Sequence, residues 1–395
     1  MKTVSRLLIV VALSVLSFAS EIQGPAKTFG EFGWSIAVSG NTLAISSGPD
    51  DSFSAVVYVY QREPGSSWNK AVLVAQLSPD DCSVGSNCTF SSVAISGDTI
   101  VAGAPELSQL GESPGGEAFV FVEGSQGWQN ATEVAHLLPD TTSQYGGFGQ
   151  SVAIDGGTIV VGAPNNNDHT GEAYEYTKPS TGWVNATETA QLTPSNGTYD
   201  IGFGDSVAVK GVVAAVGCAG TLGQVYVFQE PQAGWSNMTQ TAELTWLEGG
   251  DSSLGASVAI EGSVIVAGAP NKGSALVYFE SSSGWQNANA PDAILTPTDS
   301  VSEGFGTSVA VNTNLILVGD PLAFNGKHSN GAAFAYKKPV SGWVNATQSD
   351  RLQVSGQLVG YSVAAQNNGK AFLGAPRTTI DGKNWAGAVF LVAIK

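Results

Sequence analysis

Hydrophobic and polar residues alternate along most of this chain, and glycine-rich turns divide the alternation into short runs. The stretch from Phe148 to Pro164, FGQSVAIDGGTIVVGAP, contains an alternating run, a tight turn and a β-branched run that stops at Gly-Ala-Pro. Alternation with period two predicts a strand, glycine supplies the positive φ of a hairpin turn, and proline ends the second strand because it has no N–H to donate. The stretch therefore predicts a β-hairpin.

A similar stretch occurs seven times, at spacings of 51 to 59 residues. In each copy a serine is followed by Val or Ile and then by Ala. The seven serines are Ser35, Ser92, Ser151, Ser206, Ser257, Ser308 and Ser362. A period near 50 residues with several short strands in each unit is typical of a β-propeller.

Each unit contains two further predicted strands. The third carries aromatic residues two positions apart, which share one face of a strand. These pairs are Tyr58 and Tyr60, Phe119 and Phe121, Tyr174 and Tyr176, Tyr226 and Phe228, and Phe334 and Tyr336. The fourth strand is predicted to begin at a tryptophan and to run through T-x-x-A-x-L, as from Trp183 to Leu192. Four antiparallel strands form a blade, and neighbouring blades must cover its two faces.

The seventh unit lacks a tryptophan-led fourth strand, because the chain stops at Lys395 shortly after the third. In a closed ring, the segment from Ser20 to about Lys27 can supply the missing strand. We therefore predict an all-β fold, a seven-bladed propeller of four-stranded antiparallel blades. It forms a single domain over residues 20–395, closed by the N-terminal segment of the mature chain.

Residues 1–19 predict a secretory signal peptide. Lys2 and Arg6 precede an apolar run, and Ser17 and Ala19 place small residues at the positions that a signal peptidase inspects. The apolar run is shorter than the roughly 20 residues that a membrane-spanning helix needs, and no other segment approaches that length. We expect a secreted or cell-surface protein without a membrane span, or a periplasmic one if the source is bacterial.

Charge and composition exclude several classes of partner. The chain has 33 acidic and 16 basic residues, and removal of the signal peptide changes the net charge from −17 to −19. Such a surface repels nucleic acid and anionic membranes, so we expect neither as a partner. Because 43% of the residues are hydrophobic and only 12% are charged, the sequence indicates a packed core and not a disordered acidic tail.

Three cysteines are present. Cys82 and Cys88 lie in one loop, DDCSVGSNC, where an oxidising compartment permits a disulfide, although the spacing leaves the pairing open. Cys218 stands where other units have the Ala of Gly-Ala-Pro, and we interpret it as a small buried apolar residue.

The units resemble the FG-GAP repeat, named for pairs such as Phe148-Gly149 and Gly162-Ala163-Pro164. The resemblance covers essentially all of residues 20–395. The family includes the integrin α-subunit head, a seven-bladed propeller, and the G-W-x-N-x-T linkers look more like its secreted microbial members. The resemblance implies extracellular adhesion or ligand binding.

One feature of the integrin-like units does not carry over. Those units often place a D-x-D-x-D-G calcium loop between the Phe-Gly and Gly-Ala-Pro strands. In this chain the same connection reads SGD, DGG, KG or NTN, with one carboxylate at most, whereas calcium takes six to eight oxygen ligands. We therefore expect no metal site and no cofactor.

The loops after Gly-Ala-Pro vary most between units and are the predicted ligand-binding rim, because function concentrates on loops held by a rigid scaffold. The candidate rim residues are Asp50, Asp51, Asn165, Asn166, Asn167, Asp168, His169 and Asp381. Solvated turns have the same composition, so a plain polar loop stays an alternative.

No catalytic motif is present. The three histidines, His136, His169 and His328, lie in no nucleophile or zinc pattern. His136 stands where the next unit has Gln191, which indicates a structural position on an outer strand.

Six N-x-Ser/Thr sequons occur, at Asn87, Asn130, Asn185, Asn196, Asn237 and Asn345. Four of them share one position just after the tryptophan. A structural role for Asn and Thr explains this repetition, and so does glycosylation.

The sequence therefore favours a non-enzymatic binding or adhesion protein, expected to be a monomer, whose extracellular protein or glycan ligand meets the loop rim. One alternative is a propeller enzyme that acts on carbohydrate, and another is a structural extracellular scaffold. Acidic residues gathered at the ring axis would favour the enzyme. An aromatic-lined rim would favour the binding protein.

Overall fold

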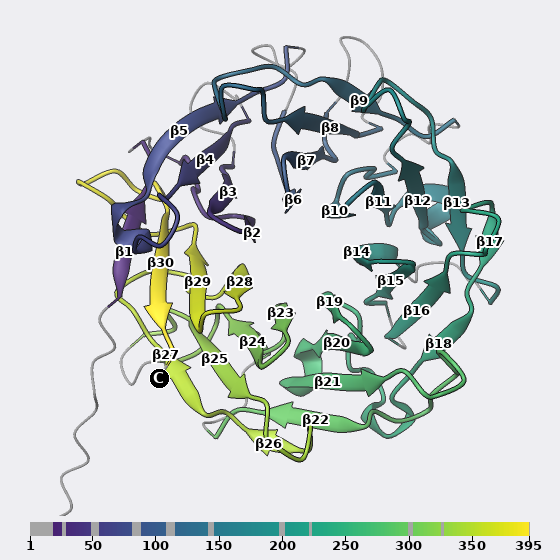
Figure 1. The fold of residues 1–395 in the computed structure, drawn as a ribbon. Helices are drawn as coiled ribbons and strands as arrows, with labels where there is room; N and C mark the ends of the chain where they lie inside the picture. Colours follow the sequence, from purple (N-terminus) through teal and green to yellow (C-terminus); the bar gives the residue numbers. More distant parts are fainter. Residues whose placement is uncertain are drawn as a thin grey trace, which may run out of the picture.

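The structure is a computed structural model of the 395-residue chain. It describes residues 19–25, 29–48, 55–80, 88–107, 115–140, 146–196, 202–220, 223–298, 303–324 and 328–394. In these residues the strands form seven sheets that stand side by side around a central axis, as Figure 1 shows. The predicted seven-bladed all-β propeller is confirmed.

Each blade contains four strands in antiparallel order from the axis outward. Blade 1 contains β2 (Ile36–Ser39), β3 (Thr42–Ser46), β4 (Val57–Gln61) and β5 (Val72–Leu77). Blade 2 contains β6 (Ser92–Ser96), β7 (Thr99–Ala104), β8 (Glu117–Val122) and β9 (Ala135–Leu137). Blade 3 contains β10 (Ser151–Asp155), β11 (Thr158–Ala163), β12 (Glu172–Thr177) and β13 (Ala190–Thr193).

The remaining blades repeat this order. Blade 4 contains β14 (Phe203–Lys210), β15 (Val213–Cys218), β16 (Gln224–Gln229) and β18 (Ala242–Leu244). Blade 5 contains β19 (Val258–Glu261), β20 (Val264–Ala269), β21 (Ser274–Phe279) and β22 (Ala293–Thr296). Blade 6 contains β23 (Ser308–Asn312), β24 (Leu315–Asp320), β25 (Ala332–Lys337) and β27 (Asp350–Leu352). Within the described ranges, helices are limited to single turns: η1 (Trp68–Lys70), α1 (Asn166–His169), η2 (Leu247–Gly249) and η3 (Pro270–Lys272).

Blade 7 closes the ring. It contains β28 (Val363–Gln366), β29 (Lys370–Ala375), β30 (Ala388–Ala393) and, as its outermost strand, β1 (Ser20–Gln23). Ser20 lies opposite Leu391 and Gln23 opposite Ala388, so the first and last strands of the chain run antiparallel. In Figure 1 the purple β1 lies beside the yellow β30. The predicted closure by the N-terminal segment is confirmed.

The core is divided into seven hydrophobic clusters, one at each junction between neighbouring blades. At the junction of blades 2 and 3, Leu137 of blade 2 packs with Tyr174, Tyr176 and Trp183 of blade 3. Phe148 of the Phe-Gly pair contacts both tyrosine rings edge-on, with centroids 5.5 and 6.3 Å apart. The aromatic residues therefore cover one face of a blade, as the sequence predicted.

The repeated serine joins each blade to the next. The serine hydroxyls donate to the carbonyl of the glycine that stands two residues before the next repeated serine, over 2.7 to 3.0 Å, from Ser92, Ser151, Ser206, Ser257, Ser308 and Ser362. Ser362 bonds to Gly33 of blade 1, so this circle of hydrogen bonds crosses the closure.

Neighbouring blades also approach closely at the glycine of Gly-Ala-Pro, and this approach leaves no room for a side chain. A Cβ on Gly162 would lie 2.1 Å from the carbonyl oxygen of Gly204 in the next blade, and the matching glycines give 1.9 to 2.2 Å. At the junction of blades 1 and 2 both partners differ, because Ser46 replaces the first glycine and Ser91, whose N–H donates to Gly103 as the N–H of Gly149 does to Gly162, replaces the second. There Ser35 Oγ instead accepts from Val93 N–H over 3.1 Å. At every junction, the glycine of Gly-Ala-Pro and the glycine that faces it in the next blade are thus either both present or both replaced.

The predicted start of the fourth strand is wrong. The outer strand begins at Ala190 in blade 3, seven residues after Trp183, and at Ala242 in blade 4, seven residues after Trp235. The tryptophan is buried at the junction with the preceding blade, and the residues that follow it pair with that blade. Two such segments form short strands, β17 (Met238–Thr239) and β26 (Ala346–Thr347), each parallel to the preceding outer strand.

Candidate functional site

One face of the ring carries both the Phe-Gly segments and the Gly-Ala-Pro loops. This follows from the topology, because each innermost strand begins at the face where the second strand ends. The residue immediately before the repeated serine lies at this face in every blade. These seven residues are Trp34, Ser91, Gln150, Asp205, Ala256, Thr307 and Tyr361.

All of these except Asp205 line a cavity of about 550 Å³. Because the lining comes from six of the seven blades, the cavity lies on the ring axis and opens at this face. We call it the axial mouth. Its volume falls within the range of about 300–1,000 Å³ that is usual for small-molecule sites.

One side of the axial mouth is aromatic. Trp34 of blade 1 and Tyr361 of blade 7 lie against each other, with ring centroids 4.6 Å apart and planes tilted by 50°. Both side chains are half-buried. Burial raises the pKa of Tyr361 to about 12, and the nearby Glu31 carboxylate adds to the rise, so the phenol stays protonated at neutral pH. It can both donate and accept a hydrogen bond.

Glu31 stands beside this aromatic pair. Its Oε1 lies 3.7 Å from Nε of Arg377, whose guanidinium lies 4.8 Å from the centroid of the Trp385 ring. Burial raises the pKa of Glu31, although the charge of Arg377 opposes the shift. Phe29 extends the group by an edge-on contact with Trp385, with centroids 5.4 Å apart.

Backbone hydrogen bonds fix this corner of the ring. The N–H groups of Phe29, Glu31 and Phe32 donate to the carbonyls of residues 384–386 over 2.8 to 3.1 Å. The segment that leads into blade 1 is thereby bound to the Gly-Ala-Pro loop of blade 7.

Unusual backbone conformations are concentrated at the same place. Of the seven non-glycine residues with positive φ in the described part of the chain, four lie here: Phe29, Glu31, Asp381 and Trp385. Such conformations cost free energy and often cluster at functional sites. Non-glycine residues with positive φ are therefore most concentrated at the corner between blades 7 and 1.

Few carboxyl groups lie at the axial mouth, although the chain as a whole is acidic. Glu31 and Glu106 belong to the lining, and Asp205 lies at the equivalent position in blade 4 without lining the cavity. Burial raises the pKa of Asp205 to about 6, while the N–H of Ala219, 3.1 Å from Oδ2, opposes the shift.

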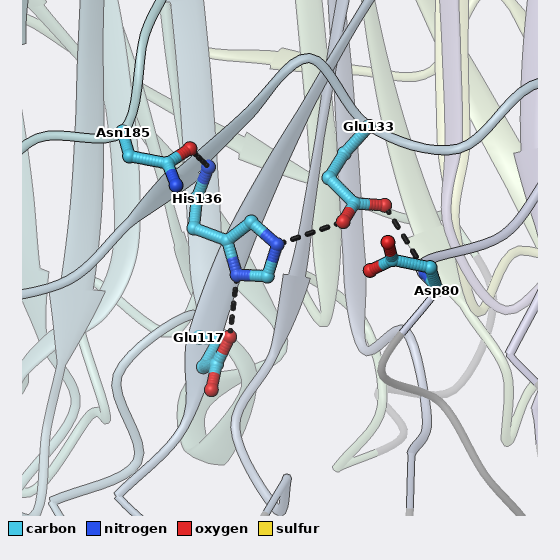
Figure 2. A network of polar contacts seen from close by, with 5 residues as sticks. All are labelled: Asp80, Glu117, Glu133, His136 and Asn185. Atoms are coloured by element: carbon cyan, nitrogen blue, oxygen red, sulfur yellow. Dashed lines mark hydrogen bonds and ion pairs between the residues drawn. The ribbon is translucent and has the colours of Figure 1, made fainter.

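A second polar network lies at the circumference, between blades 1 and 2 (Figure 2). His136 Nδ1 is 3.1 Å from Oε2 of the buried Glu117, and its Nε2 is 2.7 Å from Oε1 of Glu133. Glu133 also accepts from the N–H of Asp80 over 3.3 Å. Burial lowers the pKa of His136, but the hydrogen bonds and charges of both glutamates outweigh it, so the pKa is raised.

This network contains the one group of three metal-type ligands in the described residues, namely Asp80, Glu133 and His136. An imidazolium between two carboxylates accounts for the contacts of His136. We therefore interpret it as an ion-paired cluster of the second unit that the Asp80 N–H links to blade 1, with His136 at the outer-strand position that the sequence predicted.

The predicted rim residues do not form one site. Asp50 and Asp51 lie outside the described residues. Asn165, His169 and Asp381 are exposed, and the side chains of Asn167 and Asp168 are outside the description.

Asn166 does not face a ligand, because its side chain is buried. Its Nδ2 donates to Glu172 and, over 2.6 Å, to the hydroxyl oxygen of Tyr174, which in turn donates to Glu172. Asn166 therefore satisfies a buried carboxylate, and its assignment to the rim is corrected here.

Four sequon asparagines have a structural role. Their Oδ1 atoms accept from a backbone N–H of the preceding outer strand over 2.8 to 2.9 Å, in Asn130, Asn185, Asn237 and Asn345. Asn287 forms the same bond without a sequon. The hydrogen bond thus requires the asparagine alone, and glycosylation of these exposed residues stays a prediction.

The other two sequons and the cysteines differ. Asn196 is exposed and binds the Tyr226 hydroxyl and Glu243. Asn87 and Cys82 lie outside the described residues. Cys88 is buried and disulfide-bonded, and Cys218 is buried, with its pKa raised by burial to about 12.

Sequence reasoning missed the aromatic wall. The available signal was the variation at the position before the repeated serine, where two large aromatic residues replace Ser, Thr or Ala. Because those two residues are about 330 positions apart, only the closed ring shows that they are neighbours.

The fold and this face define the chain as a seven-bladed β-propeller. It contains an FG-GAP repeat, since the profile of that repeat matches residues 131–176, from the linker before β9 to the third strand of blade 3. No curated protein matches the sequence.

Solved structures show the same fold. A chain in the crystal structure of the mitotic checkpoint complex has a TM-score of 0.58 and 11% identity, covering 100% of this chain and 99% of that one. The WD40 β-propeller domain of Doa1 has a TM-score of 0.55 and 9% identity, covering 96% and 97%. At such identities the likeness shows the fold alone. Among the described residues, no helix has the length and apolar character to cross a bilayer.

Proposed function

We propose that this protein is a secreted or cell-surface binding protein of the adhesion type, without enzymatic activity, and that its ligand binds at the axial mouth. The observation that carries the proposal is the composition of the mouth: a wall of Trp34 and Tyr361 beside small polar side chains. Ligand sites combine apolar walls with a few placed polar groups. An extracellular protein or glycan is the ligand class that this surface fits.

Several observations support this reading over an enzyme. Of the two lining carboxylates, Glu31 and Glu106, Glu31 is paired with Arg377. The lining also contains none of the three histidines. The location outside the cell is supported by the N-terminal sequence pattern.

The test is a binding screen with the purified chain on arrays of glycans and of extracellular proteins, in calcium and in chelator. A panel of glycoside hydrolase substrates is measured in parallel. Specific binding without turnover, unchanged by chelator, is the expected result. Turnover that is lost in the Glu31→Gln variant would refute the proposal, and so would the absence of binding on both arrays.

A further inference from the structure

We infer that the axial mouth binds a neutral carbohydrate. One sugar ring lies against the wall of Trp34 and Tyr361, and its hydroxyl groups bond to Glu31 and to the polar side chains across the cavity. This inference rests on the proposed binding function and names its ligand class and its binding residues.

The repeat itself shows that the aromatic wall is not needed for folding. Trp34 and Tyr361 occupy a position that holds Ser91, Ala256 and Thr307 in other blades, with the same strands on either side. A small side chain therefore meets every structural requirement there. The two aromatic residues stand in adjacent blades and touch, so they form one continuous surface.

The chemistry of the cavity matches that of a sugar. A pyranose ring has C–H groups on its faces and hydroxyl groups around its edge, so it needs an apolar plane bordered by hydrogen-bonding groups. Trp and Tyr supply such planes and keep one polar atom each. Hydrogen-bonding groups in the lining include the Glu31 carboxylate, the Gln150 amide and the Thr307 hydroxyl.

Charge selects a neutral sugar over an acidic one. Among the described residues that line the mouth, two are carboxylates, Glu31 and Glu106, and none is Lys or Arg. Arg377 is not in the lining and lies between Glu31 and Trp385. A uronate or sulfate group in the cavity would meet like charge without a matching cation.

The backbone of the wall is held in one arrangement before a ligand arrives. The positive φ of Glu31, 43°, is maintained by the hydrogen bond from its N–H to the Trp385 carbonyl, 2.8 Å long. A preorganised site pays less entropy on binding. The strained corner between blades 7 and 1 thus fixes the carboxylate beside the aromatic pair.

The experiment is isothermal titration calorimetry of the full chain with cellohexaose, mannohexaose, chitohexaose and, as the anionic comparison, hexagalacturonate. The variants are Trp34→Thr and Tyr361→Thr, which introduce the residue that blade 6 has at this position, and Glu31→Gln. The control is Phe324→Thr, an exposed aromatic residue of a Gly-Ala-Pro loop outside the mouth. Circular dichroism and melting curves establish that each variant is folded.

We expect at least one neutral hexasaccharide to bind, with affinity reduced at least about tenfold by Trp34→Thr and by Tyr361→Thr and unchanged by Phe324→Thr. Glu31→Gln keeps the side-chain volume and is expected to weaken binding several-fold. It tests the mouth even if an aromatic variant does not fold. Equal affinity of the wild type and these mouth variants would overturn the inference. Tighter binding of hexagalacturonate would also overturn it. Hits on the protein array with no hexasaccharide binding would overturn the inference and leave the proposed binding function standing.

Discussion

Glu175 provides the sharpest test of the blade packing, because it is a carboxyl group fully buried between strands. It lies on β12, where Oε1 accepts from the Thr177 hydroxyl over 2.7 Å. Oε2 is buried without a hydrogen-bond partner among the described residues. Burial raises the pKa of Glu175 from 4.5 to about 7, the charge of Glu230 adds to the rise, and the bond from Thr177 opposes it.

The sign of the pH effect follows from this shift. Because the folded chain binds the Glu175 proton more tightly than the unfolded chain does, the contribution of Glu175 to stability is present below about pH 4.5 and is lost as the pH rises through 7. One pKa unit corresponds to about 1.4 kcal/mol. Between about pH 5.5 and pH 8, the free energy of unfolding of the wild type should therefore fall by about 2 kcal/mol relative to that of Glu175→Gln. The buried amide of the variant has its own cost, but that cost is independent of pH and cancels.

The assay is equilibrium urea unfolding followed by tryptophan fluorescence, with wild type and Glu175→Gln at both pH values. Glu63→Gln, which removes an exposed carboxylate, controls for the loss of one negative charge. If the wild type and Glu175→Gln show parallel pH profiles, the carboxyl group is not held protonated by burial and the reasoning fails.

Three further predictions concern the junctions between blades, each measured by urea or thermal unfolding. Gly162→Ala should lower the free energy of unfolding by about 1–3 kcal/mol or more, because the new Cβ would overlap the Gly204 carbonyl. The control is Gly157→Ala, whose Cβ would have ordinary contacts and which should change the free energy of unfolding little. Equal effects of the two variants would contradict the close approach of Gly162 to Gly204. Asn185→Ala should lower the free energy of unfolding by about 1 kcal/mol, because it removes the hydrogen bond from the His136 N–H. Thr187→Val destroys the sequon but keeps this bond, so it should lower the free energy of unfolding by less than about 0.5 kcal/mol. A larger loss in Thr187→Val than in Asn185→Ala would contradict a stabilising role of the hydrogen bond. Deletion of residues 20–23 should lower the melting temperature by several degrees, because it removes β1 and the buried Ile22 from the closing blade; an unchanged melting temperature would contradict closure by this strand.

The sequence predicted the ring because its signals are local and repeated. Period-two alternation located the first two strands of each unit, and the shortened seventh unit indicated that the N-terminal segment completes it. The start of the outer strand was predicted wrongly because the tryptophan and the sequon that follows it pack against the preceding blade. The residue pattern within one unit does not reveal contacts with another unit.

The candidate site was less accessible to sequence reasoning. Asn166 has the composition of a rim residue, but its side chain turns inward to a buried carboxylate, and only the three-dimensional contacts show this. Trp34 and Tyr361 meet because the ring closes, so their partnership depends on a contact between the two ends of the fold.

The pairing of β1 with β30 also determines how this ring would stand on a surface. The third strand of each blade runs away from the mouth face, so β30 ends on the opposite face, and the antiparallel β1 begins there. The two ends of the described ring therefore lie side by side at the edge of blade 7, as Figure 1 shows. A tether attached at either end would hold the opposite face toward its support and leave the mouth directed outward.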